Sequence, residues 1–370
     1  AMPPPQVWLL MSRHCPRPET ELKRTTRNIG GDTPGITYAL EVLTFKGSDK
    51  TAPGAYLQAA LHGEEFPGVA AIHFLVPMLE AAEKAGNLAG NITIVPMANP
   101  IGAAQWLNGQ PMGRFDFFSR TNFNRDHSAL DDFDTTKLPA LNAPVSAAKR
   151  LKAELLRLSL PHEIILDLHC DFESEQYMYI HAAFWPGMKD LASAIGCKAV
   201  LTWDGNADLA FEEATARPAL ASKADLPRRA VTTIEFKGLV DVSAEKGRAD
   251  AEGLYNFLVH RGVIRGKSKV KPDDFKGPVT PLENVEMVKM PLGGMVFYHV
   301  RTGEAVKNGA KLATIVPKPG DPSSDLTVTA PQSGYILTRR EFRFLPGGDD
   351  LLKLLGSKPS VTAKPGSLEA

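Results

Sequence analysis

Cysteine is scarce in this sequence, with only 3 residues among 370. Cys15, Cys170 and Cys197 cannot build a disulfide framework of the kind that stabilises small secreted domains. Free thiols suit a reducing compartment, so we expect a cytoplasmic protein.

An excess of either charge is also absent, because 42 Lys and Arg residues balance 42 Asp and Glu residues. Neither nucleic acid nor an anionic membrane is therefore expected as a main partner. No apolar run reaches the length of about 18 residues that a membrane-spanning helix requires. The apolar segment 7–11 is too short for a secretory signal, and no small-residue cleavage site follows it.

Strand-like and helix-like segments alternate from residue 36 to residue 260. Such alternation predicts an α/β fold, with a mixed, mostly parallel sheet and helices on both of its faces. The expected strands are 36–45, 55–61, 91–97, 163–168, 177–181, 199–203 and 230–236, and the expected helices are 69–84, 145–158, 191–195 and 244–260.

The pattern changes after a polar stretch at residues 265–276, which we expect to be a linker. Short strand candidates separated by glycine turns follow, without a long helix, and they predict a small all-β module. Its segments 303–309 and 334–337 resemble the barrel-sandwich domains of lipoyl and biotinyl carriers, which implies a barrel-sandwich architecture. We therefore expect domains at residues 1–270 and 277–356, with a flexible tail at 357–370 whose Ser-Leu-Glu-Ala end resembles vector sequence.

Two strand ends carry potential metal ligands. His62 and Glu65 follow the strand expected at 55–61, and His169 follows Asp167 at the end of the strand expected at 163–168. The carboxyl ends of strands in open α/β sheets form ligand-binding crevices. Two His and one Glu, with a fourth position left for water, are the ligand set of hydrolytic zinc sites. Asp167 is a candidate for orienting His169 by a hydrogen bond.

The segment 113–125 combines arginine, asparagine and aromatic residues. Arg114, Arg120 and Arg125 are candidates for carboxylate recognition, because a guanidinium group can bond both carboxylate oxygens. Asn124 adds a neutral donor beside Arg125. A basic surface loop is the alternative interpretation of this segment.

Glu235 lies near the end of the apolar run 230–236. A carboxylate there is costly unless it is paired, solvated or functional. It is a candidate general base for a zinc-assisted hydrolysis, and an exposed strand-end Glu is the alternative.

The order of these residues resembles the zinc carboxypeptidase superfamily and, within it, the succinylglutamate desuccinylase/aspartoacylase family. The motifs that carry the resemblance are His62-x-x-Glu65, Asn-Phe-Asn-Arg ending at Arg125, Asp-Leu-His ending at His169, and Glu235. The all-β module after the first domain is also typical of that family. The resemblance covers residues 30–345 and implies a zinc carboxypeptidase-like catalytic domain at residues 1–270.

The resemblance also implies a role for each residue. His62, Glu65 and His169 would hold one Zn²⁺ per chain, and Asn124 and Arg125 would bind the carboxylate of the substrate. Glu235 would activate a water molecule and then protonate the leaving amine. Arg114, or alternatively Arg120, would stabilise the oxyanion. The family often has Asp where this chain has Asn122, which can still accept a hydrogen bond from a zinc-binding histidine.

The implied activity is a zinc-dependent deacylase that cleaves the amide of a small N-acylated amino acid or amine. The alternatives are a metallocarboxypeptidase and a ligand-binding homologue without catalysis, and a homo-oligomer is compatible with exposed module edges. His127 is expected on a surface loop. The acidic group Asp171, Glu173 and Glu175 is expected to be solvated or to meet a cationic part of the substrate.

Overall fold

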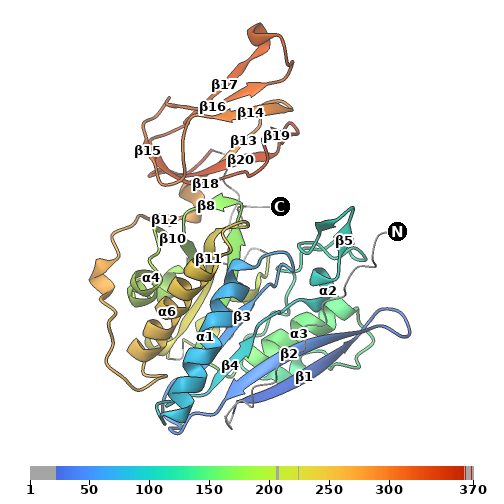
Figure 1. Ribbon diagram of the computed structural model, residues 1–370, viewed down its shortest axis with the longest axis vertical. Coiled ribbons are helices and arrows are strands. Elements are labelled where there is room, and N and C mark those ends of the chain that lie inside the picture. The colour runs from blue at the N-terminus through green and yellow to red at the C-terminus, as the bar shows by residue number, and fades with distance from the viewer. Residues whose placement is uncertain (1–21, 206–207, 224, 362, 364–367, 369–370) are drawn as a thin grey trace, which may run out of the picture.

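We analysed a computed structural model of the chain. It describes residues 22–370 apart from 206–207, 224, 362, 364–367 and 369–370. Half of the expected tail at 357–370 therefore lies outside the described residues. Figure 1 shows a large α/β body with a smaller all-β module stacked on one end of it.

A nine-stranded mixed sheet forms the centre of the α/β body, in the order β1-β2-β4-β3-β7-β11-β9-β10-β12. Five of the eight neighbouring pairs are parallel, and three are antiparallel. The expectation of a mixed, mostly parallel sheet is thus confirmed. The strands are β1 (Lys23–Gly30), β2 (Thr37–Phe45), β3 (Ala55–Ala59), β4 (Ile92–Val95), β7 (Ile164–Asp171), β9 (Tyr177–His181), β10 (Ala199–Trp203), β11 (Ala230–Gly238) and β12 (Val279–Pro281).

Every residue of β3, β4 and β7 is buried. Strands covered on both faces have apolar residues in succession, because no alternate position reaches water. The apolar runs predicted from the sequence are these central strands.

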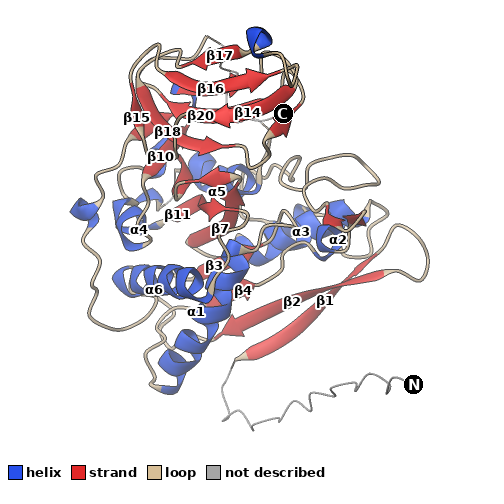
Figure 2. Cartoon of the chain, turned by 45° about the horizontal axis from the view of Figure 1, so that its top comes forward, coloured by secondary structure: helices blue, strands red, loops and turns tan. Residues whose placement is uncertain are grey.

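Helices cover both faces of the sheet (Figure 2). Helix α1 (Pro67–Lys84) packs against α6 (Ala244–His260), which also contacts α4 (Lys189–Ala194). Helix α3 (Ala147–Ser159) packs against α5 (Phe211–Ser222), and both contact strands of the sheet. A short helix, α2 (Pro100–Ala103), precedes the hairpin of β5 (Trp106–Leu107) and β6 (Gln110–Pro111). Among the described residues, none of these helices has the length and apolar character needed to cross a bilayer.

The C-terminal module consists of two antiparallel sheets. One contains β13, β20, β18 and β15 and is extended by β8 of the α/β body, and the other contains β17, β16, β14 and β19. The module has an apolar core of its own. The strands are β8 (Glu173–Ser174), β13 (Val285–Lys289), β14 (Gly294–Tyr298), β15 (Ala305–Val306), β16 (Lys311–Val316), β17 (Leu326–Thr329), β18 (Gly334–Arg339), β19 (Phe344–Leu345) and β20 (Asp350–Leu355).

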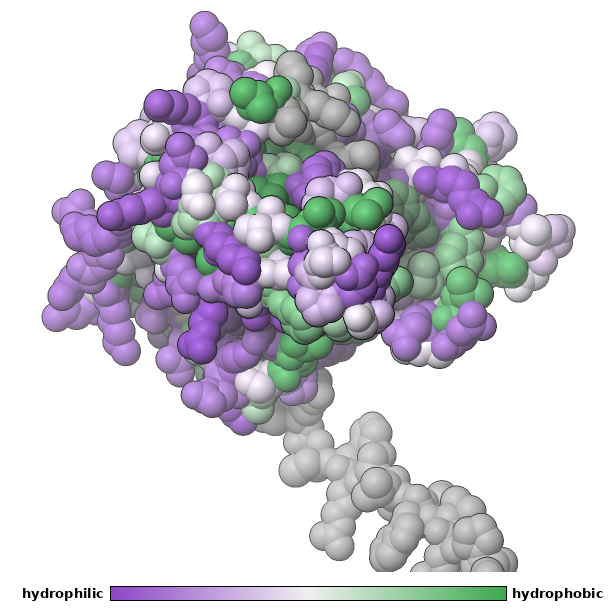
Figure 3. Space-filling view, turned by 90° about the horizontal axis from the view of Figure 1, so that it is seen from above, coloured by the Kyte–Doolittle hydropathy of each residue, from purple (hydrophilic) through white to green (hydrophobic). Residues whose placement is uncertain are grey.

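Two strands connect the module to the α/β body. Strand β8 pairs with β18, so Glu173 and Ser174 of the body lie opposite Arg339 and Thr338 of the module. Strand β12 follows the expected linker but pairs with β10 of the central sheet. The module therefore begins structurally at β13. Polar and charged side chains cover most of the face that the module presents in Figure 3.

Candidate active site

Three buried side chains bring potential metal-binding atoms together. His62 and Glu65 lie in the turn between β3 and α1, and His169 lies in β7. Their ligand atoms all fall within 4.8 Å of one another. Parallel β3 and β7 are neighbours in the sheet, which explains why residues 104 positions apart, Glu65 and His169, meet.

Hydrogen bonds fix the orientation of both imidazole rings. His62 Nε2 lies 2.8 Å from Asn122 Oδ1, and His169 Nε2 lies 2.9 Å from Asp167 Oδ2. The two Nδ1 atoms consequently face Glu65, each 2.8 Å from one of its carboxylate oxygens. When Nε2 donates to an oxygen, the Nδ1 lone pair is free to bind a metal ion. The expected hydrogen bonds from the two histidines to Asp167 and Asn122 are thus confirmed, and the three residues fit a metal ion.

Burial and charge act against each other in this cluster. Burial alone would raise the pKa of Glu65, but the neighbouring His62 and His169 hold it well below its usual range. Burial and the nearby Arg114 guanidinium lower the pKa of His62. Burial also opposes protonation of His169, yet Asp167 and Glu65 raise its pKa well above the usual value. The Glu65 and Asp167 carboxylates thus place negative charge beside the two imidazole rings, which favours a cation.

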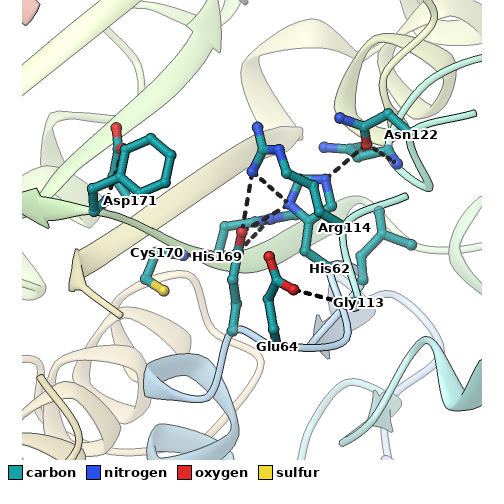
Figure 4. Close-up of polar contacts among 12 residues, drawn as sticks. His62, Glu64, Gly113, Arg114, Asn122, His169, Cys170 and Asp171 are labelled. Carbon is teal, nitrogen blue, oxygen red and sulfur yellow. Dashed lines mark hydrogen bonds and ion pairs between the residues drawn. The ribbon is translucent and has the colours of Figure 1, made fainter. Parts of the chain in front are cut away.

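Arg114 lies directly beside the metal-binding cluster (Figure 4). Its Nη1 atom is 3.3 Å from His62 Nδ1 and 3.5 Å from Glu65 Oε1. A close backbone approach sets this position, because Gly63 N–H donates to Gly113 O at 3.0 Å. A Cβ atom on Gly113 would lie 2.6 Å from the Gly63 backbone, so only glycine fits there. Arg120 instead is exposed, has a φ of 61° and does not line the cavity.

Asn124 and Arg125 line the same cavity on the side of α5. Asn124 Oδ1 accepts a hydrogen bond from the Phe211 N–H at 2.8 Å, which leaves the amide NH₂ group to donate. Arg125 Nε lies 3.5 Å from Asp208 Oδ2. Lys152 supports this segment from α3, since its ammonium group donates to Arg125 O and to Asn122 O.

Glu235 lies in β11 directly opposite His169 of β7. It lines the cavity, and its Oε2 atom has no hydrogen-bond partner among the described residues. Burial raises its pKa well above the usual value, although the charge of His169 opposes the shift. A carboxyl group with a raised pKa at this position can accept and return a proton.

The C-terminal module contributes a residue that the sequence did not reveal. Lys353 of β20 lines the cavity, and its buried ammonium group lies 2.7 Å from Asp171 Oδ2. The same Asp171 oxygen accepts a hydrogen bond from the Tyr177 hydroxyl at 2.7 Å, and the Tyr179 hydroxyl lies 3.2 Å from that of Tyr177. No local pattern in the sequence indicates the pairing of Lys353 with Asp171, because the two residues are far apart in the chain and lie in the module and the α/β body.

Two sequence predictions near the site are wrong. Asp171 is buried and paired with Lys353, and Glu173 pairs with Arg339 and Arg343, because the module covers this strand end. Asp171 and Glu173 are therefore not a solvated loop. His127 is also buried, at 2% exposure, since it packs against the Phe211 ring with 5.5 Å between ring centroids.

The cavity over these residues is small. About 90 Å³ of it can be occupied by the centre of a water molecule, several times the 10–15 Å³ that about one water requires. That space suits a small molecule. It is lined by side chains from the α/β body and from the module.

Solved structures with similar folds match nearly the whole chain. A succinylglutamate desuccinylase/aspartoacylase from Shewanella frigidimarina is 23% identical, with a TM-score of 0.79, over 92% of this chain and 100% of its own. A family protein from Shewanella amazonensis is 26% identical, with a TM-score of 0.77, over 90% of this chain and 98% of its own. The product-bound ectoine utilization protein EutE from Ruegeria pomeroyi is 17% identical, with a TM-score of 0.67, over 92% of this chain and 97% of its own.

No curated protein matches the chain. The sequence model of the succinylglutamate desuccinylase/aspartoacylase catalytic domain, however, matches residues 51–261, which is more than half of the chain. The matched segment contains both histidines and Glu65 of the cluster, Arg114, Asn124, Arg125 and Glu235. The chain therefore belongs to the succinylglutamate desuccinylase/aspartoacylase family.

Proposed function

We propose that this protein is a zinc-dependent amidohydrolase that removes the acyl group from a small N-acylated amino acid or amine. The observation that carries the proposal is the orientation of His62 and His169, whose Nδ1 atoms both face Glu65 while their Nε2 atoms bond other residues. Two His nitrogens and one carboxylate form the protein ligand set of catalytic zinc sites.

Zinc held by His62, Glu65 and His169 would supply Lewis-acid chemistry, polarising the scissile carbonyl and acidifying a water molecule. Glu235 accepts the proton of the attacking water, and its raised pKa allows it to hold this proton and deliver it to the leaving nitrogen. Arg114 donates hydrogen bonds to the oxygen on which negative charge develops.

Arg125 and the Asn124 amide hold the carboxylate of the substrate in this proposal. A guanidinium group and a neighbouring NH₂ group can bond the two carboxylate oxygens together. The module closes the cavity through Lys353 and so limits the size of the substrate. We propose residues 1–270 as the catalytic domain and the module as a cavity wall. The buried free thiols of Cys170 and Cys197 support a cytoplasmic location.

The variant Glu235→Gln tests the proposal, assayed on a panel of N-acetyl, N-succinyl and N-formyl amino acids and on short peptides. We expect the wild-type protein to release amine from a member of the acyl panel. The variant should retain zinc and lose that activity by a factor of about 10² to 10⁴. Near-full activity of the variant would contradict the role of Glu235, and cleavage of the peptides alone would indicate a carboxypeptidase. Glu245→Gln, on the exposed first turn of α6, is the control for loss of a glutamate charge.

A further inference from the structure

Three polar atoms in the cavity wall have no hydrogen-bond partner among the described residues and no place in the proposed chemistry. They are Glu212 Oε2, Thr233 Oγ1 and Trp203 Nε1. Thr233 and Trp203 are buried, at 3% and 6% exposure. A buried polar group without a partner is destabilising, so three of them beside a cavity indicate that a ligand supplies the partners.

Apart from Glu212, Glu235 and the Glu65 carboxylate of the His62, Glu65 and His169 cluster, the acidic side chains that line this cavity each have a partner. Asp171 pairs with Lys353, and Asp208 lies 3.5 Å from Arg125. Glu213 accepts a hydrogen bond from the Leu209 N–H at 2.9 Å. Glu212 is different, because one of its carboxylate oxygens is buried and unbonded.

The three groups come from separate elements that meet at the cavity. Thr233 is two residues before Glu235 in β11, so both side chains lie on the same face of the sheet. Trp203 ends β10, and Glu212 lies in the first turn of α5. The Glu212 carboxyl group interacts with the charges of Asp167 and Arg125 and with the Thr233 hydroxyl, which can donate its proton to Glu212 and still accept a hydrogen bond from a ligand.

We propose that Glu212, Thr233 and Trp203 form a subsite for a second nitrogen of the substrate, an ammonium or carboxamide group on the amino acid side chain. This inference rests on the proposed deacylase function and names the class of amine that it releases. An ionised Glu212 and the Thr233 hydroxyl accept hydrogen bonds from nitrogen, whereas the indole N–H of Trp203 can only donate. A carboxamide would satisfy all three groups, and an ammonium would pair with Glu212.

An acidic side chain on the substrate is disfavoured at this subsite. A second carboxylate beside Glu212 would place two like charges in a partly desolvated wall. Burial raises the pKa of Glu212, and the nearby Arg125 offsets the shift only partly. A bound ammonium group would favour the ionised carboxylate.

The separation of Thr233 from Glu235 agrees with a short side chain on the substrate. Thr233 and Glu235 are separated by about 7 Å along the strand, twice the rise of about 3.3 Å per residue. A side chain of three or four bonds spans most of that distance from the reacting amide.

The experiment compares the Nα-acyl derivatives of ornithine, glutamine, norvaline and glutamate, with the acyl group that the panel identifies, as substrates of the zinc-loaded protein. These side chains have similar lengths and end in an ammonium, a carboxamide, a methyl group and a carboxylate. A hydrogen bond to a charged group contributes about 1.5–3 kcal/mol, so kcat/KM for ornithine or glutamine should exceed that for norvaline and glutamate by about 10- to 100-fold. In Glu212→Gln that preference should disappear, while the norvaline derivative keeps its kcat/KM within about threefold.

Two more variants separate the subsite from general damage. Thr233→Val removes the hydroxyl at nearly constant shape and should weaken the same preference by a smaller factor. Glu245→Gln removes a charge from the matching first turn of α6 and should leave the preference unchanged. If Glu212→Gln loses turnover of the ornithine derivative alone, the subsite binds an ammonium group. If the variant loses turnover of both the ornithine and the glutamine derivatives, the subsite binds an ammonium or a carboxamide group.

Binding of the free amino acids, measured by calorimetry on the same proteins, does not depend on turnover. If no N-acetyl, N-succinyl or N-formyl derivative is hydrolysed but ornithine or glutamine binds in a Glu212-dependent manner, the subsite stands and the proposed function fails. If Glu212→Gln changes neither binding nor substrate preference, or if the glutamate derivative is preferred, the subsite assignment is overturned.

Discussion

His62 Nε2 lies 2.8 Å from the amide oxygen of Asn122, whereas the matching atom of His169 lies 2.9 Å from a carboxylate oxygen of Asp167. The two histidines thus have the same geometry but different electrostatic support. A neutral acceptor raises the basicity of an imidazole less than a charged one does. His62 should therefore be the weaker of the two metal ligands.

The Asn122 side chain allows a direct test of this difference. Asn122→Asp should tighten zinc binding, and Asn122→Ala should weaken it by about 10- to 100-fold, because His62 loses its orienting partner. Competition with a chelating dye gives the dissociation constants. Asn142→Ala, at an exposed position, should have no effect. Equal zinc affinity in all these proteins would show that Asn122 does not support a metal ligand.

Arg114 and Arg120 are six residues apart, but only Arg114 reaches the metal-binding cluster. Arg114→Ala should lower kcat by about 10² to 10³, the usual cost of removing one oxyanion donor. Arg120→Gln should remain within about twofold of wild type, since surface substitutions rarely disturb a site. Steady-state kinetics on one N-acyl substrate decides the matter, and a larger loss in Arg120→Gln would reverse the assignment.

Lys353 and Asp171 form a buried ion pair between the module and the α/β body. Lys353→Met should destabilise the protein by about 3–5 kcal/mol, because Asp171 remains buried without its partner. The double variant with Asp171→Asn should recover much of this loss. Urea unfolding of the single and double variants measures the coupling. Strictly additive effects would mean that the two residues contribute independently.

Asp250 provides a pH-dependent contribution to stability outside the active site. Burial raises the pKa of its carboxyl group from 3.8 to about 6. The stability gained from the neutral form is therefore complete below about pH 4 and is lost as the pH rises through about 6. Asp250→Asn should be more stable than wild type at pH 8, by about 2–3 kcal/mol from a shift of about two units, and the difference should shrink toward pH 5. Chemical unfolding at several pH values tests this, and a constant difference would contradict it.

Much of the fold was predictable because its central strands are continuous apolar runs. The predicted strands 177–181 and 199–203 coincide with β9 and β10, and the predicted helix 244–260 coincides with α6. Strand β1 was missed because its polar sequence lies at an exposed sheet edge, where no apolar alternation is needed. Helix α5 was missed because its alanine-rich sequence has few large apolar residues to define a helical period.

The candidate site, like the fold, was predictable only in part. His62 and Glu65 follow β3, and His169 lies near the end of β7. Parallel pairing brings these two strand ends to one edge of the sheet, so the proximity of the three candidate ligands could be inferred from the sequence. Lys353, by contrast, reaches the cavity only because β18 of the module pairs with β8 of the body. Glu212 enters through the first turn of the missed helix α5. Contacts between distant elements leave no periodic pattern in the chain.

Zinc content of the purified protein tests the central claim most directly, with N-acyl amino acid hydrolysis followed on the same sample. We predict one zinc ion per chain, loss of amine release on chelation and recovery on addition of zinc. His169→Ala should bind no zinc at the same concentrations, because it removes one of three ligands. A wild-type protein that binds no zinc after reconstitution would contradict the assignment of His62, Glu65 and His169 as a catalytic metal site.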